Sequence, residues 1–349
     1  MAKPHPRSAP LRVALAGAGM ISYYHLVAWS HAGGRARVVA ICDPDSTRAR
    51  KRAGEFGIAR VYDSADAMFA AETLDALDVA SPRETHAVWV EAAAARGIDA
   101  LCQKPLAPTL GEAEALVSRV GGRVRLMVHE NWRFRPWYRE LQRWLAAGEV
   151  GDILGGYMTM FSSGLLPDES GRRPALIRQP FMAHEARLMI AETLIHHLDV
   201  MRWLVGPLRV IGARTARTLT EVEGETLATI FLESAAGAPI VVTGTMGAPG
   251  FPPRTEDRLE LIGRGASAVL TGTDLRLLGP RPRSASYEFD AGYQSSFDGV
   301  IHHFVECLMT GAPFETGPVD NLETLRLVEH AYWAAGHHAS GTRRQGGIG

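Results

Sequence analysis

Short apolar runs alternate with amphipathic stretches along the first third of the chain. The apolar runs have the length of buried strands, and the stretches between them place apolar residues at helical spacing. The predicted strands lie near residues 11–16, 37–42, 58–61, 76–80, 99–103 and 123–128. The predicted helices lie near residues 19–32, 45–56, 64–71, 84–96 and 109–119. This alternation predicts the α/β fold class, with a doubly wound parallel sheet that helices cover on both faces.

The pattern changes after Asn131. A long helix is predicted near 186–205, after a helix near 135–147, a strand near 153–162 and a loop rich in Pro, Gly and Arg at 164–180. Later apolar segments have the spacing of antiparallel strands, and two further helices follow them. The apolar segments lie near 208–217, 225–234, 239–247, 257–262 and 267–278. The two helices lie near 295–310 and 320–338. The second part of the chain therefore predicts a different kind of sheet.

Two domains follow from this change of pattern. The 349 residues exceed what a single hydrophobic core usually supports. We predict one domain over residues 1–130 and a second over 131–349, the second an α+β domain with a large, mostly antiparallel sheet. We expect that sheet to leave one apolar face uncovered, and therefore a homodimer or homotetramer through that face. The tail from Ser340 is predicted to be disordered.

A glycine motif stands between the first predicted strand and the first helix. The strand is followed at once by Gly17-Ala18-Gly19-Met20-Ile21-Ser22. In this order Gly17 permits a tight turn, Gly19 lets the backbone approach a pyrophosphate, and the helix amino terminus offers N–H groups to it. Ser22 stands where a third glycine or alanine is usual. The motif indicates a dinucleotide site, although an ordinary strand-to-helix turn has the same short pattern.

An acid at the end of the second strand strengthens the dinucleotide interpretation. Asp43 lies 24 residues after Gly19, the spacing expected for a carboxylate that binds the adenosine ribose hydroxyls. A 2′-phosphate beside that carboxylate would meet like-charge repulsion, so NAD is favoured over NADP. Arg48 and Arg50 could reverse this preference, but we expect them to be solvated surface charges. Residues 1–130 are therefore predicted to form a Rossmann domain that binds NAD.

Charge and cysteine usage exclude several classes of function. The net charge is -1 and the basic residues form no stripe, so neither nucleic acid nor an anionic membrane surface is an expected partner. Cys42, Cys102 and Cys307 lack metal-ligand spacing and are expected to be core thiols in a reducing compartment. No signal-peptide or membrane-spanning apolar run is evident. We therefore predict a cytoplasmic protein without a metal site.

One lysine stands where a reaction could be catalysed. Lys104 follows the fifth predicted strand in the run Leu101-Cys102-Gln103-Lys104-Pro105-Leu106. In doubly wound sheets ligands bind beyond the carboxyl ends of the strands. A cation fixed there by the following proline can reach a substrate hydroxyl. Lys104 is therefore a candidate catalytic residue.

A second candidate group lies on the long helix of the second domain. Glu192, His196 and Asp199 stand at i, i+4 and i+7 and share one face. A carboxylate one turn from a histidine can fix its tautomer and raise its basicity, which suits a base for a hydroxyl proton. A hydrogen-bonded surface or interface is the alternative interpretation. A metal site with His197 is disfavoured, because adjacent residues on a helix point about 100° apart.

These motifs together resemble the Gfo/Idh/MocA oxidoreductase family. The resemblance rests on the glycine turn, Asp43, the Ala80-Ser81-Pro82 strand end with His86, and Gln103-Lys104-Pro105. The family's usual Glu-Lys-Pro is Gln-Lys-Pro here, and its Asp-x-x-x-His-x-x-Asp helix runs from Glu192 to Asp199. The resemblance implies that Lys104 and His196 are catalytic and that Glu192 takes the place of the family's aspartate.

The resemblance also implies two sets of binding residues. The implied cofactor-binding residues are Gly17, Gly19, Met20, Ile21, Asp43, Ser81, Pro82, His86, Gln103, Lys104 and Asn131. The implied substrate-binding residues are Lys104, Glu130, Trp132, Arg133, Glu192 and His196. Trp132 is equally interpreted as a packing residue. The segments 102–109, 127–134 and 178–181 resemble a branch of the family that includes dehydrogenases of apiose.

The expected activity is transfer of a hydride from a hydroxyl of a sugar or polyol to NAD, with C1 of an apiose-like pentose as the best guess. Whether Lys104 or His196 is the formal base stays open, because burial and the charge of the other residue can shift the pKa of either group. Two alternatives also stay open. One is an NAD-binding sensor without turnover. The other is an enzyme that holds NAD tightly and catalyses elimination or epimerisation.

Overall fold

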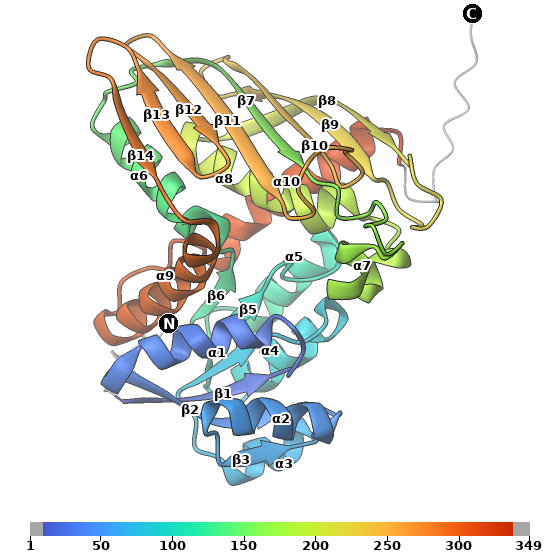
Figure 1. Cartoon of the computed structure of the whole chain (residues 1–349). Coiled ribbons are helices and arrows are strands. Elements are labelled where there is room, and N and C mark those ends of the chain that lie inside the picture. The colour runs from blue at the N-terminus through green and yellow to red at the C-terminus, as the bar shows by residue number, and fades with distance from the viewer. Residues whose placement is uncertain (1–9, 338–349) are drawn as a thin grey trace, which may run out of the picture. The chain divides into compact units, whose positions relative to one another are not determined.

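The computed structural model describes residues 10–337, so the tail predicted to be disordered lies outside the described residues. The chain forms two compact units. The first runs up to Glu140 and includes Tyr287–Leu325, and the second contains Leu141–Ser286 and the chain from Arg326. Each unit has its own sheet, shown in Figure 1. This grouping differs from a division at residue 130, because a late segment packs with the first unit.

The first unit is built on a parallel sheet of six strands in the order β3-β2-β1-β4-β5-β6. The chain leaves β1 for β2 on one side and later adds β4 on the other, so the strand order reverses at β1, where such sheets bind ligands. The strands are β1 Leu11–Ala16, β2 Ala36–Cys42, β3 Arg60–Tyr62, β4 Ala76–Val79, β5 Asp99–Gln103 and β6 Leu126–His129. The helices between them are α1 Ser22–His31, α2 Ser46–Phe56, α3 Ala65–Ala71, α4 His86–Ala94 and α5 Leu110–Val120. The predicted doubly wound sheet is confirmed.

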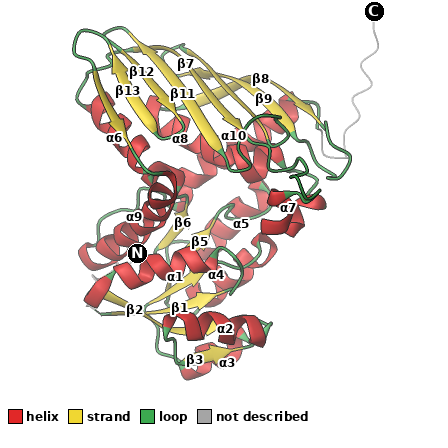
Figure 2. Cartoon of the chain, in the orientation of Figure 1, coloured by secondary structure: helices red, strands yellow, loops and turns green. Residues whose placement is uncertain are grey.

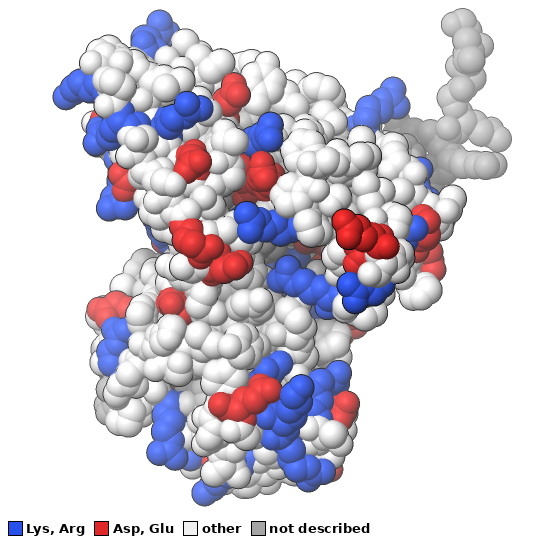
Figure 3. Space-filling view, in the orientation of Figure 1, with Lys and Arg blue, Asp and Glu red and all other residues white. Residues whose placement is uncertain are grey.

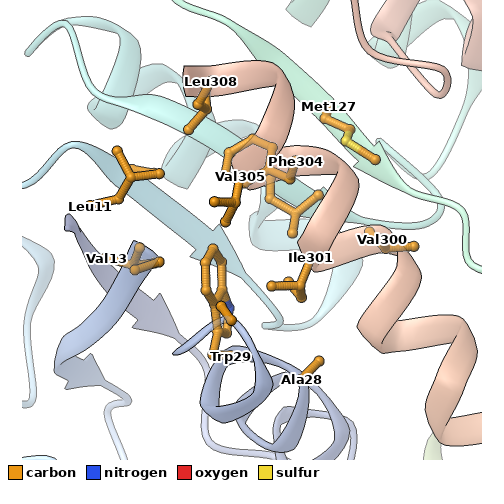
Figure 4. Close-up of a cluster of buried hydrophobic side chains, with 14 of the residues drawn as sticks. Leu11, Val13, Ala28, Trp29, Met127, Val300, Ile301, Phe304, Val305 and Leu308 are labelled. Carbon is orange, nitrogen blue, oxygen red and sulfur yellow. The ribbon is translucent and has the colours of Figure 1, made fainter. Parts of the chain in front are cut away.

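Helix α9, Phe289–Thr310, completes the core of the first unit. Figure 4 shows Phe304 and Val305 of this helix among side chains from β1 and α1. Trp29 of α1 meets the Phe304 ring edge-on at 6.3 Å between centroids. The sequence assigned this helix to the second domain, because its apolar spacing does not show which sheet it covers. The packing therefore corrects the predicted division of the chain for residues 289–310.

Local signals fix the ends of the helices near the sheet edge. Asp45 caps α2 by accepting hydrogen bonds from the N–H groups of Thr47 and Arg48. Thr109 and Glu112 form a capping box at the start of α5. Side-chain oxygens satisfy amide groups that a helix start leaves without partners, so they determine where each helix begins.

The second unit contains an eight-stranded sheet in the order β14-β13-β12-β11-β7-β10-β9-β8. Its neighbouring strands are antiparallel except for β7 and β10, which are parallel. The strands are β7 Ile153–Phe161, β8 Leu208–Ala216, β9 Leu227–Ser234, β10 Pro239–Thr245, β11 Glu256–Gly263, β12 Ser267–Thr271, β13 Asp274–Leu278 and β14 Arg283–Ser286. The predicted mostly antiparallel sheet is confirmed. The segment predicted at 267–278 is a hairpin, however, and β14 is too polar to have been recognised.

Helices lie on one face of this sheet, as Figure 2 shows. They include α6 Pro136–Ala146, α7 Pro174–Arg178, α8 Ile195–Val205 and α10 Pro318–Ala334, with α6 and α10 each crossing a boundary between the units. Helix α7 lies in the segment predicted to be a loop. The helix predicted at 186–205 begins instead as a π-helical turn, Met189–Leu194, which continues into α8. A β-carbon on Gly244 would lie 2.8 Å from Leu194, so this turn packs closely on β10.

The surface is mixed in charge. Lysine and arginine side chains are interspersed with aspartate and glutamate on the face shown in Figure 3. Between residues 10 and 337, no helix has both the length and the apolar character needed to span a bilayer.

Candidate functional site

The glycine turn after β1 is held against the end of β4. Gly17 has a φ of 100°, and its N–H donates to the carbonyl of Cys42 at 2.8 Å. A β-carbon on Gly17 would lie 2.7 Å from the backbone of Ala80, so only glycine fits. A β-carbon on Gly19 would meet nothing within 4 Å. The turn is therefore closed behind Gly17 and open at Gly19, as a pyrophosphate cradle requires.

The start of α1 completes this cradle. Met20 and Ile21 lead into the helix, and no side chain caps its N-cap residue Ile21. The buried Ser22 hydroxyl donates to the carbonyl of Gly19 at 2.6 Å and accepts from Arg52 Nε at 3.1 Å. Serine at the position of the usual third glycine therefore stabilises the turn. The uncapped helix terminus can receive a phosphate.

Asp43 binds the same turn from the end of β2. Its Oδ2 accepts from the N–H of Ala18 at 2.7 Å, and its Oδ1 accepts from the N–H of Asp45 and from Arg48, both at 2.9 Å. Burial alone would raise the pKa of Asp43, but the hydrogen bonds from Arg48, Ala18 and Asp45 outweigh burial and lower it. Asp43 is thus an ionised acceptor at neutral pH. Arg48 pairs with it and is not the solvated charge expected from the sequence.

His86 connects the loops that follow β4 and β5. Its Nδ1 lies 2.8 Å from the carbonyl oxygen of Pro105, and its Nε2 lies 3.0 Å from that of Ser81. The Ser81 and Thr85 hydroxyls are hydrogen-bonded at 2.7 Å, and Thr85 also donates to the carbonyl of Pro82. His86 therefore shapes the sheet edge through two backbone carbonyls. Any contact that it makes with the cofactor stays a prediction.

Lys104 and Glu130 follow two neighbouring strands. Gln103 of β5 and His129 of β6 are the last paired residues, so the residues after them start at the same edge of the sheet. The Gln103 Oε1 accepts from the N–H of Lys104 at 2.7 Å. Asn131 donates to the Ser296 hydroxyl of α9 at 2.8 Å. The first unit thus gathers Lys104 and Glu130 at the edge that carries the glycine turn.

The next turn, Trp132–Phe134, is held by charged side chains of the same unit. Arg133 is 2% exposed and donates to Asp320 at 2.7 Å and to the carbonyl of Glu315 at 3.3 Å. The Arg135 guanidinium lies over the Trp132 ring at 3.5 Å from its centroid. Arg133 and Trp132 therefore each have a structural role, and the contact with substrate predicted for these two residues stays a prediction.

Glu192 and His196 lie on consecutive turns of the second unit. Glu192 belongs to the π-helical turn, and His196 follows in the first turn of α8 with 6% exposure. His197, which was weighed as a metal ligand, instead lies 2.8 Å from Asp257 and 3.2 Å from the carbonyl of Thr193. Among residues 10–337, no three His, Cys, Asp or Glu side chains form a group that could hold a metal ion.

Two residues that the sequence did not reveal anchor the start of this π-helical turn. Glu225, just before β9, accepts from the N–H groups of Leu188 at 3.2 Å and Ile190 at 3.0 Å. The Tyr332 hydroxyl donates to Glu225 and accepts from the N–H of Ala191. Burial, followed by the Glu225 charge, raises the pKa of Tyr332. Glu225 lies in an ordinary acidic stretch and Tyr332 far along the chain, so no local signal could have paired them.

The glycine turn, the Asp43 carboxylate beside it and the reversal point of the sheet are the features of a dinucleotide-binding domain. The family model described as an oxidoreductase family with an NAD-binding Rossmann fold matches residues 11–129. A model of the Gfo/Idh/MocA C-terminal domain matches residues 138–269. The chain belongs to the Gfo/Idh/MocA family, and its cofactor is NAD.

Relatives match nearly the whole chain. A D-apiose dehydrogenase of Paraburkholderia graminis is 36% identical, over 92% of this chain and 87% of its own length. A D-apiose dehydrogenase of Rhizobium rhizogenes is 32% identical, over 93% and 95%. The crystal structure of an Agrobacterium radiobacter oxidoreductase with NAD+, L-tartaric acid and magnesium has a TM-score of 0.86 and 30% identity, over 93% of this chain and 96% of that chain.

We expect Asp43→Asn to weaken NAD binding about tenfold or more, because a hydrogen bond to a charged acceptor contributes about 1.5–3 kcal/mol. NADP should lose less affinity, since the variant removes the charge that repels a 2′-phosphate. Titration of each nucleotide against the protein measures both effects. Asp45→Asn is the matched control, because asparagine caps a helix as well as aspartate does. Equal losses of NAD affinity in the two variants would contradict the role of Asp43.

We expect Tyr332→Phe to lower the free energy of unfolding by about 1–3 kcal/mol, because Ala191 N–H and Glu225 each lose a buried partner. Urea unfolding of the whole chain measures this loss. Trp333→Phe, at the neighbouring position with 69% exposure, is the control and should change stability little. If the two variants lose the same stability, the hydroxyl does not anchor the π-helical turn.

Proposed function

We propose that this protein is an NAD-dependent dehydrogenase of a sugar or polyol, with C1 of an apiose-like pentose as the oxidised carbon. The observation that carries the proposal is the position of Lys104 directly after β5, at the sheet edge that also carries the glycine turn and Asp43. The two relatives named D-apiose dehydrogenase support the choice of substrate.

Oxidation of an alcohol breaks the C–H and O–H bonds of one carbinol group and leaves a C=O bond. Bound NAD supplies the acceptor for the hydride. The protein must hold the oxygen and remove the proton. We assign to Lys104 the task of holding the reacting oxygen, because its Nζ would hydrogen-bond to that oxygen and stabilise alkoxide character. An aldose in its ring form would give a lactone, and a polyol would give a ketone.

We assign the proton to His196. Glu192 precedes it by one turn, so its carboxylate can fix the imidazole tautomer and raise its basicity. Glu225 and Tyr332 support this assignment indirectly, because they anchor the turn that carries Glu192. The start of the turn that precedes the proposed base is thus held by buried hydrogen bonds within the same unit.

Glu130 and Trp132 are the proposed substrate contacts beyond the reacting group. Glu130 is fully buried directly after β6, and Trp132 is 8% exposed in the next turn. A carboxylate and an aromatic ring are suited to the hydroxyls and the apolar face of a sugar. Arg133 supports them from its ion pair with Asp320.

The direct test is the growth of NADH absorbance when the purified protein meets NAD or NADP with D-apiose, other pentoses, hexoses, uronic acids or inositols. Turnover of D-apiose with NAD is the expected result. Turnover of another sugar would keep the reaction and change the substrate. No turnover with NAD binding intact would favour the sensor, and conversion of substrate without NADH release would favour the tight-cofactor enzyme.

We expect Lys104→Met to lower kcat by about a hundredfold or more, the range for loss of a positioned proton-handling group. The Kd for NAD should stay within about threefold, because methionine keeps the apolar stem and removes only the amino group. Lys51→Met is the matched control, since the sequence has only three lysines and Lys51 is exposed on α2. Loss of NAD binding in the Lys104 variant would reassign this residue to the cofactor.

We also propose that the protein is a homodimer or homotetramer through the outer face of the eight-stranded sheet. Phe231 of β9 and Tyr157 of β7 are 43% and 54% exposed, and both pair with Val241 of β10. Neighbouring strands thus place apolar side chains side by side on the face opposite the buried one. Large exposed apolar patches of this kind are typical of interfaces.

We expect Phe231→Glu combined with Tyr157→Glu to reduce the mass measured by analytical ultracentrifugation to that of a single chain, because two charges cannot be buried unpaired. Ile177→Glu, at a 60% exposed position on α7, should leave the mass unchanged. A wild-type protein that sediments as a single chain would contradict the proposed interface.

The location proposed for this enzyme is the cytoplasm. Cys42, Cys102 and Cys307 are free thiols, and all three are buried. Free buried thiols are usual in reducing compartments.

A further inference from the structure

A row of buried polar side chains lies behind Lys104 in the first unit. Asp78 of β4 and His25 of α1 are fully buried, and Gln103 of β5 is 9% exposed. The mechanism proposed above gives none of the three a chemical step. Buried polar groups without partners are costly, so a row of them requires an explanation.

The hydrogen bonds in this row have one consistent direction. The N–H of Lys104 can only donate, so the Gln103 atom that faces it at 2.7 Å is the oxygen. The Gln103 amide nitrogen then donates to His25 Nε2 at 3.1 Å. His25 Nδ1 therefore carries the ring proton and donates to Asp78 Oδ2 at 2.9 Å. His25 is thus a neutral imidazole between an amide donor and a carboxylate.

The surroundings of His25 contain one carboxylate. Trp29 Nε1 also donates to Asp78 Oδ2, at 2.7 Å. His129 of β6 stacks on His25 with 4.2 Å between ring centroids, and burial lowers the pKa of His129 well below its usual value. The Phe297 ring of α9 meets the His25 ring edge-on, with 5.5 Å between the ring centroids. His25 therefore faces the Asp78 charge, the Gln103 amide and a neutral imidazole.

The backbone around Lys104 is held on both sides. Gln103 Oε1 binds the N–H of Lys104, and the buried His86 lies 2.8 Å from the carbonyl of Pro105. The peptide groups before Lys104 and after Pro105 are thus each held by a side chain that is itself buried. A side chain whose backbone is fixed in this way starts from one defined position, which is what a reacting group needs.

We propose that Asp78, His25 and Gln103 are positioning residues for Lys104, and that the network requires an uncharged side chain at residue 103 to stay intact at all working pH values. The inference rests on the proposed function, because Lys104 is the reacting group only there. Gln103 has two parts in the network. Its oxygen orients Lys104, and its amide hydrogen satisfies the neutral His25.

Replacing Gln103 by Glu tests the second part. The new carboxylate can still accept from the N–H of Lys104, but it offers no hydrogen to His25 Nε2. Both carboxylates, Asp78 and residue 103, are then paired only if His25 takes up a second proton. The network in Gln103→Glu is therefore intact at low pH and is lost as the pH rises and that proton leaves.

The experiment compares wild type, Gln103→Leu and Gln103→Glu across pH 6–9, with D-apiose and NAD for kcat, NAD titration for Kd and urea unfolding for stability. Gln103→Leu should lower kcat by about tenfold to a hundredfold at every pH, since small misplacement of a reacting group has effects of that size. A rise in its Kd for NAD beyond about threefold would assign Gln103 to the cofactor, as the family resemblance implies, and would overturn the inference. Gln103→Glu should recover most of kcat at the acid end, and then lose kcat and the urea midpoint together as the pH rises.

The outcomes separate this inference from the proposed function. A Gln103→Glu variant whose kcat and urea midpoint follow the wild-type pH dependence overturns the inference, and it remains informative if Gln103→Leu does not fold. A Gln103→Leu variant that loses stability but keeps kcat shows a purely structural role and also overturns it. Should Lys104→Met retain turnover, the proposed function itself fails. The urea midpoints still test the network in that case, because they need no substrate.

Discussion

The backbone of Gly17 lies against the end of β4, and the cofactor site depends on this contact. A side chain at this position would collide with Ala80, so the turn can approach only as glycine. Because the Gly17 N–H also binds the carbonyl of Cys42, the ends of β1, β2 and β4 are fixed relative to one another. Asp43 then reaches the N–H of Ala18. On the other side of the turn, a β-carbon on Gly19 would have no atom within 4 Å.

The two proposed reacting groups are supported in the same physical way, each within its own unit. The side-chain oxygen of Gln103 accepts from the backbone N–H of Lys104. The carboxylate of Glu225 accepts from two backbone N–H groups shortly before Glu192. Glu225 accepts a further hydrogen bond from the Tyr332 hydroxyl, and Gln103 in turn donates through its amide nitrogen to His25 Nε2. A buried carboxylate without such donors would destabilise the fold. Precise backbone placement therefore depends on complete hydrogen bonding in the interior.

Much of the fold and part of the site could be predicted from the sequence, because they depend on short-range signals. The parallel fold itself imposes the alternation of strands and helices, and it also imposes the spacing between the glycine turn and Asp43. The segment Met189–Leu194 was predicted as ordinary helix, since α and π turns share an apolar pattern and differ only in backbone hydrogen bonding. The pairing of Glu225 with Tyr332 joins residues far apart in sequence. Likewise, the apolar pattern of α9 predicts a helix but not the sheet on which it packs.

Burial keeps several titratable groups near the two proposed reacting residues uncharged. His129 and Cys102 lie behind the edge that carries Lys104, and burial moves the pKa of His129 far down and that of Cys102 far up. Tyr332 has a raised pKa for the same leading reason. All three groups therefore remain neutral near pH 7. In such an interior a hydrogen bond is stronger than at the surface and an unmet donor costs more. Of the three, Tyr332 fixes geometry directly, through its hydrogen bonds to Glu225 and to the N–H of Ala191.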